Sequence, residues 1–441
     1  MTSPSPAAPS GTDTPPSGLR TTPPQSTVLH NHWVLALGWV LAHLIPVVWI
    51  NRYGTSTGDV HYYFVGVNHF FPDTMTEYPV IGALPAHLVN LLPGGEDAYI
   101  NWFIALCVAT SAVFTAWLVY MDSSPSHRAA WFWIMFIGLS GPIVLTRLDL
   151  FPSLTVAAFA ALLFARTRAA RRAAAIVLAV ATMMKLWPGV LGAALVGGFR
   201  RRSTWARIGW FFGSLVVICL LIAAVSGVDA LTTPLNYQSD RGLQIESLAA
   251  TPVMLAASFA AVGDTRWSIS YAASKSFEII GPGAGIMTTV ATVATAAMVL
   301  FALGWAVTRL IRDDWSPMQA LSFSLTMVAL IIATNKVFSP QYITWLAPSV
   351  AVALLVSRRR IVAVLAVEVL VTALLTTFVY PVYYDWLMVV PTATQAVVIL
   401  ALRNVGILVI AGTALWWAVT AAREDVTAFP VTSGRRGSSR R

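Results

Sequence analysis

The chain carries few charged residues for its length. Of 441 residues only 11% are Asp, Glu, Lys or Arg, whereas 57% are hydrophobic. Soluble domains carry about 25% charged residues, so this composition excludes a water-covered protein of this size, and its hydrophobicity excludes a disordered or collagen-like chain. The sequence therefore predicts an integral membrane protein, whose surface is covered mainly by lipid.

Cysteines, metal-binding patterns and nucleotide-binding motifs are also scarce. Cys107 and Cys219 are the two cysteines, and both lie in apolar runs, so a disulfide framework is excluded. His61 and His69 are not on adjacent helical turns, and no other cluster has metal-ligand spacing. A glycine loop of the form GxxxxGK is missing as well. We expect neither a metal ion nor another cofactor.

Apolar runs long enough to cross a bilayer recur along the sequence. Two shorter runs, 173–184 and 188–199, flank Pro188 and are expected to form either two tilted helices or a broken pair. With this pair counted as two, the sequence predicts an all-α polytopic membrane protein with about 12 transmembrane helices, within a range of 10–12. The longer runs are residues 33–50, 98–120, 129–145, 150–165, 205–227, 285–308, 316–334, 341–357, 361–379 and 396–421.

The segments outside these runs differ in composition. Residues 1–32 are rich in Pro, Ser and Thr and predict a disordered tail, while 422–441 form a basic tail. Residues 33–421 are predicted to form one transmembrane domain. Its loops 51–97 and 228–284 are long, and their aromatic and apolar content predicts short helices on the membrane surface.

The basic residues indicate the orientation. With a cytoplasmic amino terminus, twenty of the twenty-eight Lys and Arg residues fall on the cytoplasmic side, as the positive-inside rule requires. We therefore expect a multi-pass plasma-membrane protein with both termini cytoplasmic and the two long loops extracytoplasmic. The net charge of +9 marks topology and does not indicate a nucleic-acid partner.

Two carboxylate-containing motifs lie in the first long loop. Asp59, in the motif GDVHYY, follows the first span at the start of an apparent surface helix, where an acid serves either as a helix cap or as a functional group. Glu77 and Tyr78 lie in a turn that contains Pro79. Both motifs place polar groups at the edge of the membrane.

Arg147 and Asp149 interrupt two spans at their outer ends. They are predicted either to form an ion pair that anchors the turn or to line a polar cavity, because charged groups are costly beside lipid.

Lysine is rare: the three lysines contrast with twenty-five arginines, and all three fall on the predicted outer side. Lys185 lies at the helix break and Lys336 between two spans, where each either reaches toward lipid headgroups or binds a phosphate. The break favours phosphate binding, because freed backbone groups at membrane depth must line a cavity.

Two more charged residues, Glu368 and Arg403, lie inside predicted spans. Their depths differ by roughly 10 Å, so we expect no pair between them, and Arg403 is predicted to extend outward to lipid phosphate.

Five short motifs resemble those of glycosyltransferase family 87 in their order and placement: GDVHYY, EYP, RLDLFP, MKLWP and NKVFSPQYITWLAP. The resemblance covers roughly residues 33–420. This family contains actinobacterial polyprenol-phosphate-mannose-dependent mannosyltransferases with the GT-C fold. The resemblance implies a membrane enzyme that moves mannose from polyprenyl phosphate to an envelope glycolipid or lipoglycan, of the phosphatidylinositol mannoside or lipomannan type, with inversion.

The resemblance also implies residue roles. Asp59 matches the family's catalytic acid and would act as general base, and a second carboxylate is not needed because a phosphate leaving group requires no protonation. By position, donor phosphate binding is assigned to Lys185, Lys336 and Arg147. Sugar or acceptor binding is assigned to Glu77, Tyr78, His61, Tyr62, Asp149, Gln341 and Tyr342. The expected partners are membrane lipids, the polyprenyl-phosphate donor and the glycolipid acceptor.

The second long loop is predicted to enclose the site and keep water from the donor, with Tyr237, Gln238, Arg241 and Trp267 contributing. Two alternatives stay open. One is a GT-C enzyme for another lipid-linked sugar, such as arabinofuranose or glucose. The other is a twelve-span transporter or lipid flippase, which predicts two related halves that the sequence does not show.

Overall fold

The computed structural model describes residues 31–421, except residues 55, 72, 73, 123, 125, 240 and 273 and the side chains of 236–239. The predicted tails therefore lie outside the described residues, apart from residues 31 and 32. The helices are α1 (His32–Tyr53), α2 (Gly58–Val67), α3 (Val80–Val89), α4 (Glu96–Met121), α5 (Arg128–Leu139), η2 (Gly141–Thr146), α6 (Leu150–Leu163), α7 (Arg168–Met184), η3 (Trp187–Leu195), α8 (Arg202–Ser226), α9 (Asp229–Ser239), α10 (Thr251–Ser258), α11 (Ala284–Arg312), α12 (Pro317–Thr334), η4 (Pro340–Trp345), α13 (Ala347–Val356), α14 (Arg360–Thr377), η5 (Phe378–Val382), α15 (Tyr384–Leu387) and α16 (Thr394–Thr420).

The prediction of an all-α polytopic membrane protein is confirmed. In the described part of the chain, seven helices are long and apolar enough to cross a membrane: α1, α4, α8, α11, α12, α14 with its continuation to Val382, and α16. The remaining predicted runs appear as shorter segments, namely α5 with η2, α6, α7, η3, and η4 with α13. Each predicted run thus has a helical counterpart, although five of these counterparts are not among the helices long and apolar enough to cross a membrane.

Of the two alternatives for residues 173–199, the structure has the broken pair, and its two halves are unequal. α7 is a regular helix that stops at Met184, and η3 follows as a nine-residue 3₁₀ segment. At about 2 Å per residue, η3 covers only about 18 Å, which is less than the roughly 30 Å of a hydrocarbon core. The chain returns to the far end of the bundle through residues 196–199, where the Phe199 N–H donates to the Leu310 carbonyl at 2.9 Å.

The helices pack around α12. Its spanning window is 83% buried, whereas the windows of α8 and α11 are only 11% and 17% buried. Ser322, Ser324 and Thr326 fit this interior because each hydroxyl donates to the carbonyl four residues earlier, at 2.7–2.9 Å. α8 and α11 accordingly present most of their apolar side chains to lipid.

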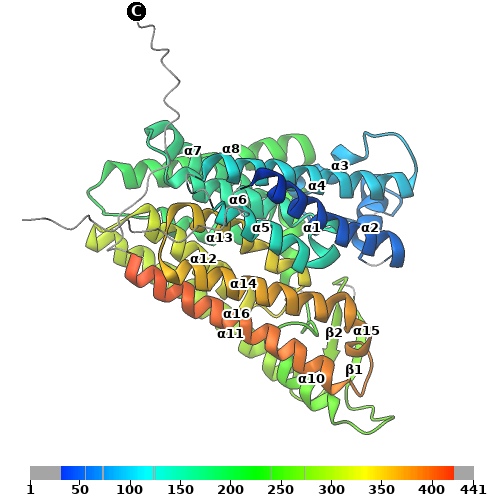
Figure 1. Ribbon diagram of the computed structural model, residues 1–441. Coiled ribbons are helices and arrows are strands. Elements are labelled where there is room, and N and C mark those ends of the chain that lie inside the picture. The colour runs from blue at the N-terminus through cyan, green and yellow to red at the C-terminus, as the bar shows by residue number, and fades with distance from the viewer. Residues whose placement is uncertain are drawn as a thin grey trace, which may run out of the picture.

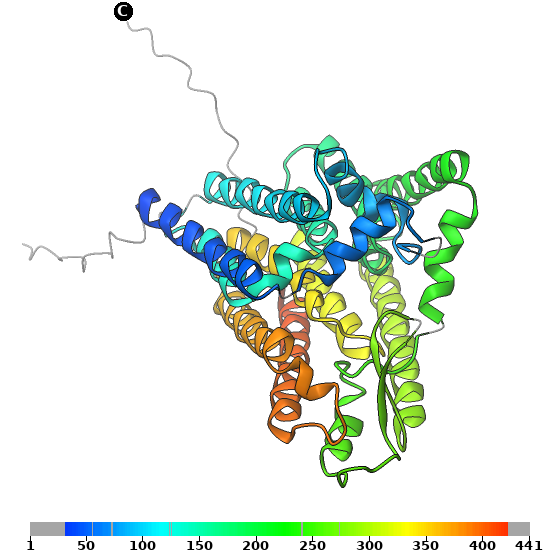
Figure 2. The same cartoon turned by 90° about the vertical axis from the view of Figure 1, so that its right-hand side faces the viewer.

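The segments between α1 and α4 and between α8 and α11 gather at one end of the bundle, here called the loop end. They carry α2 and α3, and α9 and α10, as the sequence analysis expected of the two long loops. Figure 1 shows α2, α15 and the strands beside one another beyond the long helices, and Figure 2 looks onto this end.

A small β-structure at the loop end was not predicted. β1 (Ser268–Tyr271) and β2 (Phe277–Ile280) form an antiparallel hairpin. The segment from Leu243 to Ile245 extends it: the Ile245 N–H donates to the Phe277 carbonyl at 3.1 Å, and the Ile279 N–H donates to the Leu243 carbonyl at 3.0 Å. Four-residue strands give too short an alternating pattern to be read from sequence.

Candidate active site

A cavity of about 670 Å³, here called the site cavity, lies at the loop end. Four helical segments end beside it, and each is followed by a residue that lines the cavity: Asp59 after α1, Arg147 after η2, Lys185 after α7 and Asn335 after α12. The charged residues that line it are Asp59, Glu77, Arg147, Lys185, Arg241, Glu246 and Lys275. Side chains from segments far apart in the sequence therefore share one polar space.

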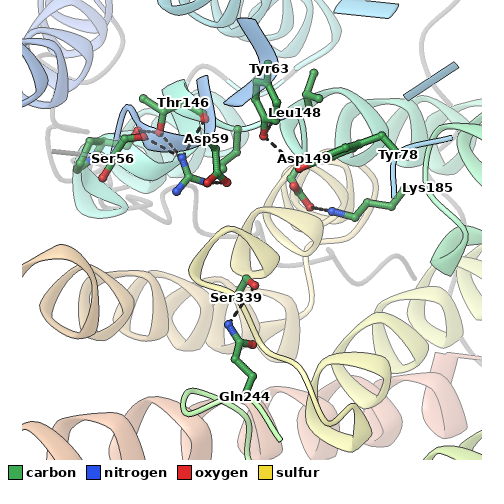
Figure 3. A network of polar contacts seen from close by, with 12 residues as sticks. Ser56, Asp59, Tyr63, Tyr78, Thr146, Leu148, Asp149, Lys185, Gln244 and Ser339 are labelled. Atoms are coloured by element: carbon green, nitrogen blue, oxygen red, sulfur yellow. Dashed lines mark hydrogen bonds and ion pairs between the residues drawn. The ribbon is translucent and has the colours of Figure 1, made fainter. Parts of the chain in front are cut away.

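Asp59 is paired with a buried arginine. Its Oδ2 atom lies 2.7 Å from Arg147 Nε, and its side chain is 41% exposed, compared with 7% for Arg147. Arg147 Nη1 donates to the carbonyl of Ser56 at 2.8 Å and to that of Thr146 at 3.0 Å (Figure 3). The arginine is therefore fixed between α1 and η2, while the carboxylate stays accessible from the cavity.

This pairing corrects one expectation and answers another. The ion pair considered between Arg147 and Asp149 does not form, because Arg147 contacts Asp59 instead. The N-cap position of α2 belongs to Thr57, and Asp59 lies in the first turn facing Arg147. The carboxylate therefore does not serve merely to cap the helix.

Asp149 contacts Lys185 and a tryptophan. Asp149 Oδ1 lies 2.5 Å from Lys185 Nζ and accepts a 2.6 Å hydrogen bond from Trp345 Nε1. Asp149 is 1% exposed, and Lys185 is 25% exposed and lines the cavity (Figure 3). The buried carboxylate thus holds the lysine at the cavity wall, so that its ammonium group reaches the open space.

Aromatic rings form the wall beneath Lys185. Trp345 stacks on Tyr342 with ring centroids 3.9 Å apart and on Trp187 at 4.8 Å. Lys185 Nζ lies 5.3 Å from the centroids of both Tyr342 and Trp345, within cation–π range. Tyr342, Trp345 and Trp187 all line the cavity. Tyr342 was a predicted site residue, whereas the two tryptophans were missed.

Tyr63 and Tyr78 form the wall behind Asp59. Their hydroxyl oxygens are 3.4 Å apart, and the Leu148 N–H donates to the Tyr63 hydroxyl at 3.5 Å. Burial raises the pKa of both tyrosines well above its ordinary value, and the Asp59 charge raises the pKa further. Both phenols therefore remain protonated hydrogen-bond donors at neutral pH.

Tyr62 connects the two long loops. Its hydroxyl donates to Glu77 Oε2 at 2.9 Å and accepts hydrogen bonds from the Met75 N–H at 2.7 Å and from Lys275 Nζ at 2.5 Å. Lys275 Nζ also lies 4.5 Å from the centroid of the Tyr62 ring. Lys275 belongs to the turn between β1 and β2, so the hairpin contacts the helix that carries Asp59.

Glu246 and Arg403 form a fully buried pair. Both side chains are 0% exposed, and Arg403 Nη2 donates to the Glu246 carbonyl at 2.8 Å and lies 3.4 Å from Oε2. Burial raises the pKa of Glu246 to about 7, although the charges of Arg403 and Arg147 oppose the shift. The prediction that Arg403 extends to lipid is wrong, because its guanidinium group is enclosed between α16 and the second loop. Glu246 was missed.

Glu368 has a separate environment. Its Oε1 accepts a 2.8 Å hydrogen bond from the Thr413 hydroxyl on α16. As expected, Glu368 and Arg403 do not pair, because Arg403 contacts Glu246 instead.

The structure brings most of the predicted site residues together. Those that line the site cavity are Asp59, Tyr62, Glu77, Tyr78, Arg147, Lys185, Gln341 and Tyr342. Asp149 lies directly behind Lys185. His61 instead pairs with Glu96, and Lys336 is not among the lining residues, although its carbonyl accepts the Gln244 N–H at 3.1 Å.

The second loop contributes several lining residues. Arg241 lines the cavity as expected, Trp267 is not among its lining residues, and the side chains of Tyr237 and Gln238 lie outside the described residues. Lining residues that the sequence analysis missed include Gln244, Lys275, Tyr271, Tyr380 and Tyr384. A tyrosine-rich segment beside a predicted span was the signal available for Tyr380 and Tyr384, whereas the others come from the unpredicted β-structure and its neighbours. Among the described residues, no group of three or more His, Cys, Asp or Glu side chains has the geometry of a metal site.

The fold and the cavity define a polytopic membrane protein with a polar, carboxylate-containing pocket at one end of its helix bundle. The model of glycosyltransferase family 87 matches residues 76–340, and the chain belongs to this family. It is therefore a membrane glycosyltransferase, and a transporter or flippase function is not supported. The match includes Glu77, Arg147 and Lys185, while Asp59 precedes it. No curated protein and no solved structure matched the chain.

Proposed function

We propose that the protein transfers mannose from polyprenyl-phosphate mannose to a cell-envelope glycolipid or lipoglycan by a single inverting displacement. The observation that carries this proposal is the placement of Asp59. It is an accessible carboxylate in a cavity that also contains Arg147 and Lys185, at the end of a membrane bundle. Attack by a hydroxyl requires a base, and departure of a phosphate is favoured by cations, so both kinds of group are needed in one space.

The lower part of the cavity supports a lipid-linked donor. Met298 and Val299 of α11 line it, together with Val190 and Ile331. The Thr295 hydroxyl of α11 donates to the carbonyl of Thr334, the last residue of α12, at 3.0 Å. Met298 and Ile331 lie one helical turn from these two residues, so the apolar part of the cavity begins about 5 Å inside the bundle. Val299 is 43% exposed, so the cavity is open at this residue. This apolar lining on the bundle side of the cavity fits a substrate with a hydrocarbon chain.

In the proposed mechanism, Asp59 accepts the proton of the acceptor hydroxyl as its oxygen attacks the anomeric carbon. The bond from that carbon to the phosphate oxygen breaks, and the electron pair leaves with the phosphate. Lys185 stabilises the phosphate charge as it departs, while Arg147 orients Asp59. Glu77, Tyr78, Gln341 and Tyr342 are proposed to bind the sugars.

Orientation follows from charge. The helix ends opposite the loop end carry Arg128, Arg168, Arg202, Arg312 and Arg360. By the positive-inside rule we place this end in the cytoplasm, with both termini, and place the site cavity on the extracytoplasmic side of the plasma membrane.

The test is transfer by reconstituted protein. Purified protein in liposomes receives envelope glycolipids and either radiolabelled polyprenyl-phosphate mannose or, in a parallel reaction, radiolabelled polyprenyl-phosphate arabinose. We expect labelled glycolipid from the mannose donor, and transfer at least about 100-fold slower after Asp59→Asn. Transfer from the arabinose donor alone would refute the mannose assignment, and equal transfer by the Asp59 variant would refute the mechanism.

A further inference from the structure

The Glu246–Arg403 pair lies between the membrane helices and two walls of the site cavity. The first wall is the segment Phe338–Tyr342, and the second is the β1–β2 hairpin. Arg403 lies on α16, and Glu246 lies on the second loop between α9 and α10. The Arg403 guanidinium group also lies 3.7 Å from the ring centroid of Phe338, directly before η4. One buried cation therefore contacts two segments that are remote from each other in the sequence.

Glu246 is two residues from Gln244, which holds the first wall. Gln244 Oε1 accepts the Phe338 N–H at 2.6 Å. Gln244 Nε2 donates to Ser339 Oγ at 3.3 Å, as Figure 3 shows. The wall that begins at Phe338 carries Gln341 and Tyr342 into the cavity. Displacement of the Gln244–Glu246 segment would therefore shift both of these residues.

The same segment also holds the second wall. Ile245 bonds to Phe277 of β2 at 3.1 Å, and the turn of this hairpin places Lys275 against Tyr62. Tyr62 lies one helical turn after Asp59 on α2. A continuous series of contacts therefore runs from Arg403 to the helix that carries the carboxylate.

The chemistry of the pair is costly for a purely structural anchor. Among the described residues, Arg403 Nε and Nη1 are buried without a hydrogen-bond partner. Buried ion pairs with unsatisfied atoms contribute little or nothing to stability compared with apolar side chains of similar size. The raised pKa of Glu246 is a further sign of this cost.

We infer that Glu246 and Arg403 are positioning residues, which fix the Phe338–Tyr342 wall and the hairpin relative to Asp59. This inference rests on the proposed function for its activity readout. It adds a role for two residues outside the reacting groups, and it assigns α16 to the organisation of the site.

The test replaces the pair by apolar side chains of similar size, Glu246→Leu with Arg403→Met. Melting temperature, hydrogen exchange of residues 336–345, and kcat and KM for polyprenyl-phosphate mannose are then measured in liposomes. We expect a melting temperature close to that of the wild type, faster exchange in this segment and a kcat about tenfold lower. Addition of Gln244→Leu to this double variant should cause no comparable further loss of kcat. Gln244 belongs to the same series of contacts, which the double variant has already broken.

The matched control is Arg309→Met with Asp314→Leu, which removes a 2.7 Å ion pair at the opposite end of the bundle. It should leave exchange of residues 336–345 and transfer unchanged. The inference is overturned if the Glu246/Arg403 double variant keeps the exchange rate and the kcat of the wild type. It is also overturned if both double variants lose kcat and their melting temperatures fall by the same amount, because the loss would then reflect general destabilisation. Hydrogen exchange is measured without substrate, so it decides the inference even if the wild type does not transfer mannose. Failure of the wild type to transfer mannose would refute the proposed function alone.

Discussion

Lys275 Nζ lies 2.5 Å from the hydroxyl of Tyr62, although 213 residues separate the two side chains in the sequence. One residue belongs to the hairpin of the second long loop and the other to the first helix of the first long loop. Their contact joins the two long loops at the loop end of the bundle. Tyr62 lies one turn after Asp59, so the second loop contacts the helix that carries the candidate base.

Removal of the Tyr62 hydroxyl should loosen this contact. Tyr62→Phe leaves the Met75 N–H, Glu77 and Lys275 without their shared partner, at a cost of about 1–3 kcal/mol. We expect faster hydrogen exchange in residues 268–280 and a higher KM for the acceptor. Tyr53→Phe is the control, since Tyr53 is 70% exposed at the end of α1. Unchanged exchange in Tyr62→Phe would show that the hairpin is held by other contacts.

Asp59→Asn should lower kcat by about 100- to 10,000-fold, the range expected for loss of a general base. The amide keeps the size of the side chain and can still contact Arg147. Binding of polyprenyl-phosphate mannose, measured separately with radiolabelled donor, should change much less than kcat. A parallel loss of donor binding and kcat would assign Asp59 to substrate binding instead.

Lys185 should affect use of the donor. Lys185→Met removes a charge-assisted contact worth about 1.5–3 kcal/mol, which corresponds to roughly a 10- to 100-fold rise in donor KM or fall in kcat/KM. Because this change leaves the buried Asp149 unpaired, the double variant Lys185→Met with Asp149→Asn separates donor use from folding. Lys336→Met is a matched control, since Lys336 does not line the cavity. An equal defect in Lys336→Met would show that both lysines reach the phosphate.

Glu246 should make stability depend on pH. Its pKa is raised from 4.5 to about 7 by burial, so between these values the folded protein holds a proton that the unfolded chain releases. The free energy of unfolding should therefore fall as pH rises through this window, by at most about 1.4 kcal/mol per pH unit.

The measurement is thermal unfolding between pH 5 and pH 8 for wild type and Glu246→Gln. The variant should lose this part of the pH dependence, because its amide does not titrate. Parallel curves for the two proteins would contradict the assignment of the raised pKa to Glu246.

Gly82 should not tolerate a larger side chain. A Cβ atom at this position of α3 would lie 2.1 Å from the carbonyl oxygen of Met184, directly before Lys185. We expect Gly82→Ala to destabilise the protein by about 1–3 kcal/mol and to lower transfer by moving the end of α7. Gly412→Ala on α16 meets no atom within 4 Å and should be neutral or slightly stabilising. A wild-type melting temperature for Gly82→Ala would mean that α3 can shift without cost.

The predictable part of the site consisted of residues that follow an apolar run. Asp59, Arg147 and Lys185 could be placed at the membrane boundary because each follows a predicted span, and spans alternate in direction. Lys275 and Gln244 could not be found in this way, because they lie deep within a long loop whose short strands have no distinctive pattern. Glu246 was missed for the same reason.

The choice of partners was also beyond sequence reasoning. Arg147 and Asp149 are two residues apart and invited pairing, yet Arg147 contacts Asp59 and Asp149 contacts Lys185. Adjacent residues at the end of a helix point in different directions, and each side chain pairs with whichever neighbouring segment it faces.

The sequence alone determined that this is a membrane protein, the approximate position of each helical segment and the family to which it belongs. Hydropathy and charge decide the first two features locally, because every stretch of chain exchanges water for lipid largely independently of the others, whereas the five short motifs indicate the family. Only the tertiary structure decided which carboxylate meets which cation, and that Arg403 is enclosed against Glu246. Such contacts depend on how distant segments meet at the loop end, where directional hydrogen bonds and charges select among neighbours that packing has brought together.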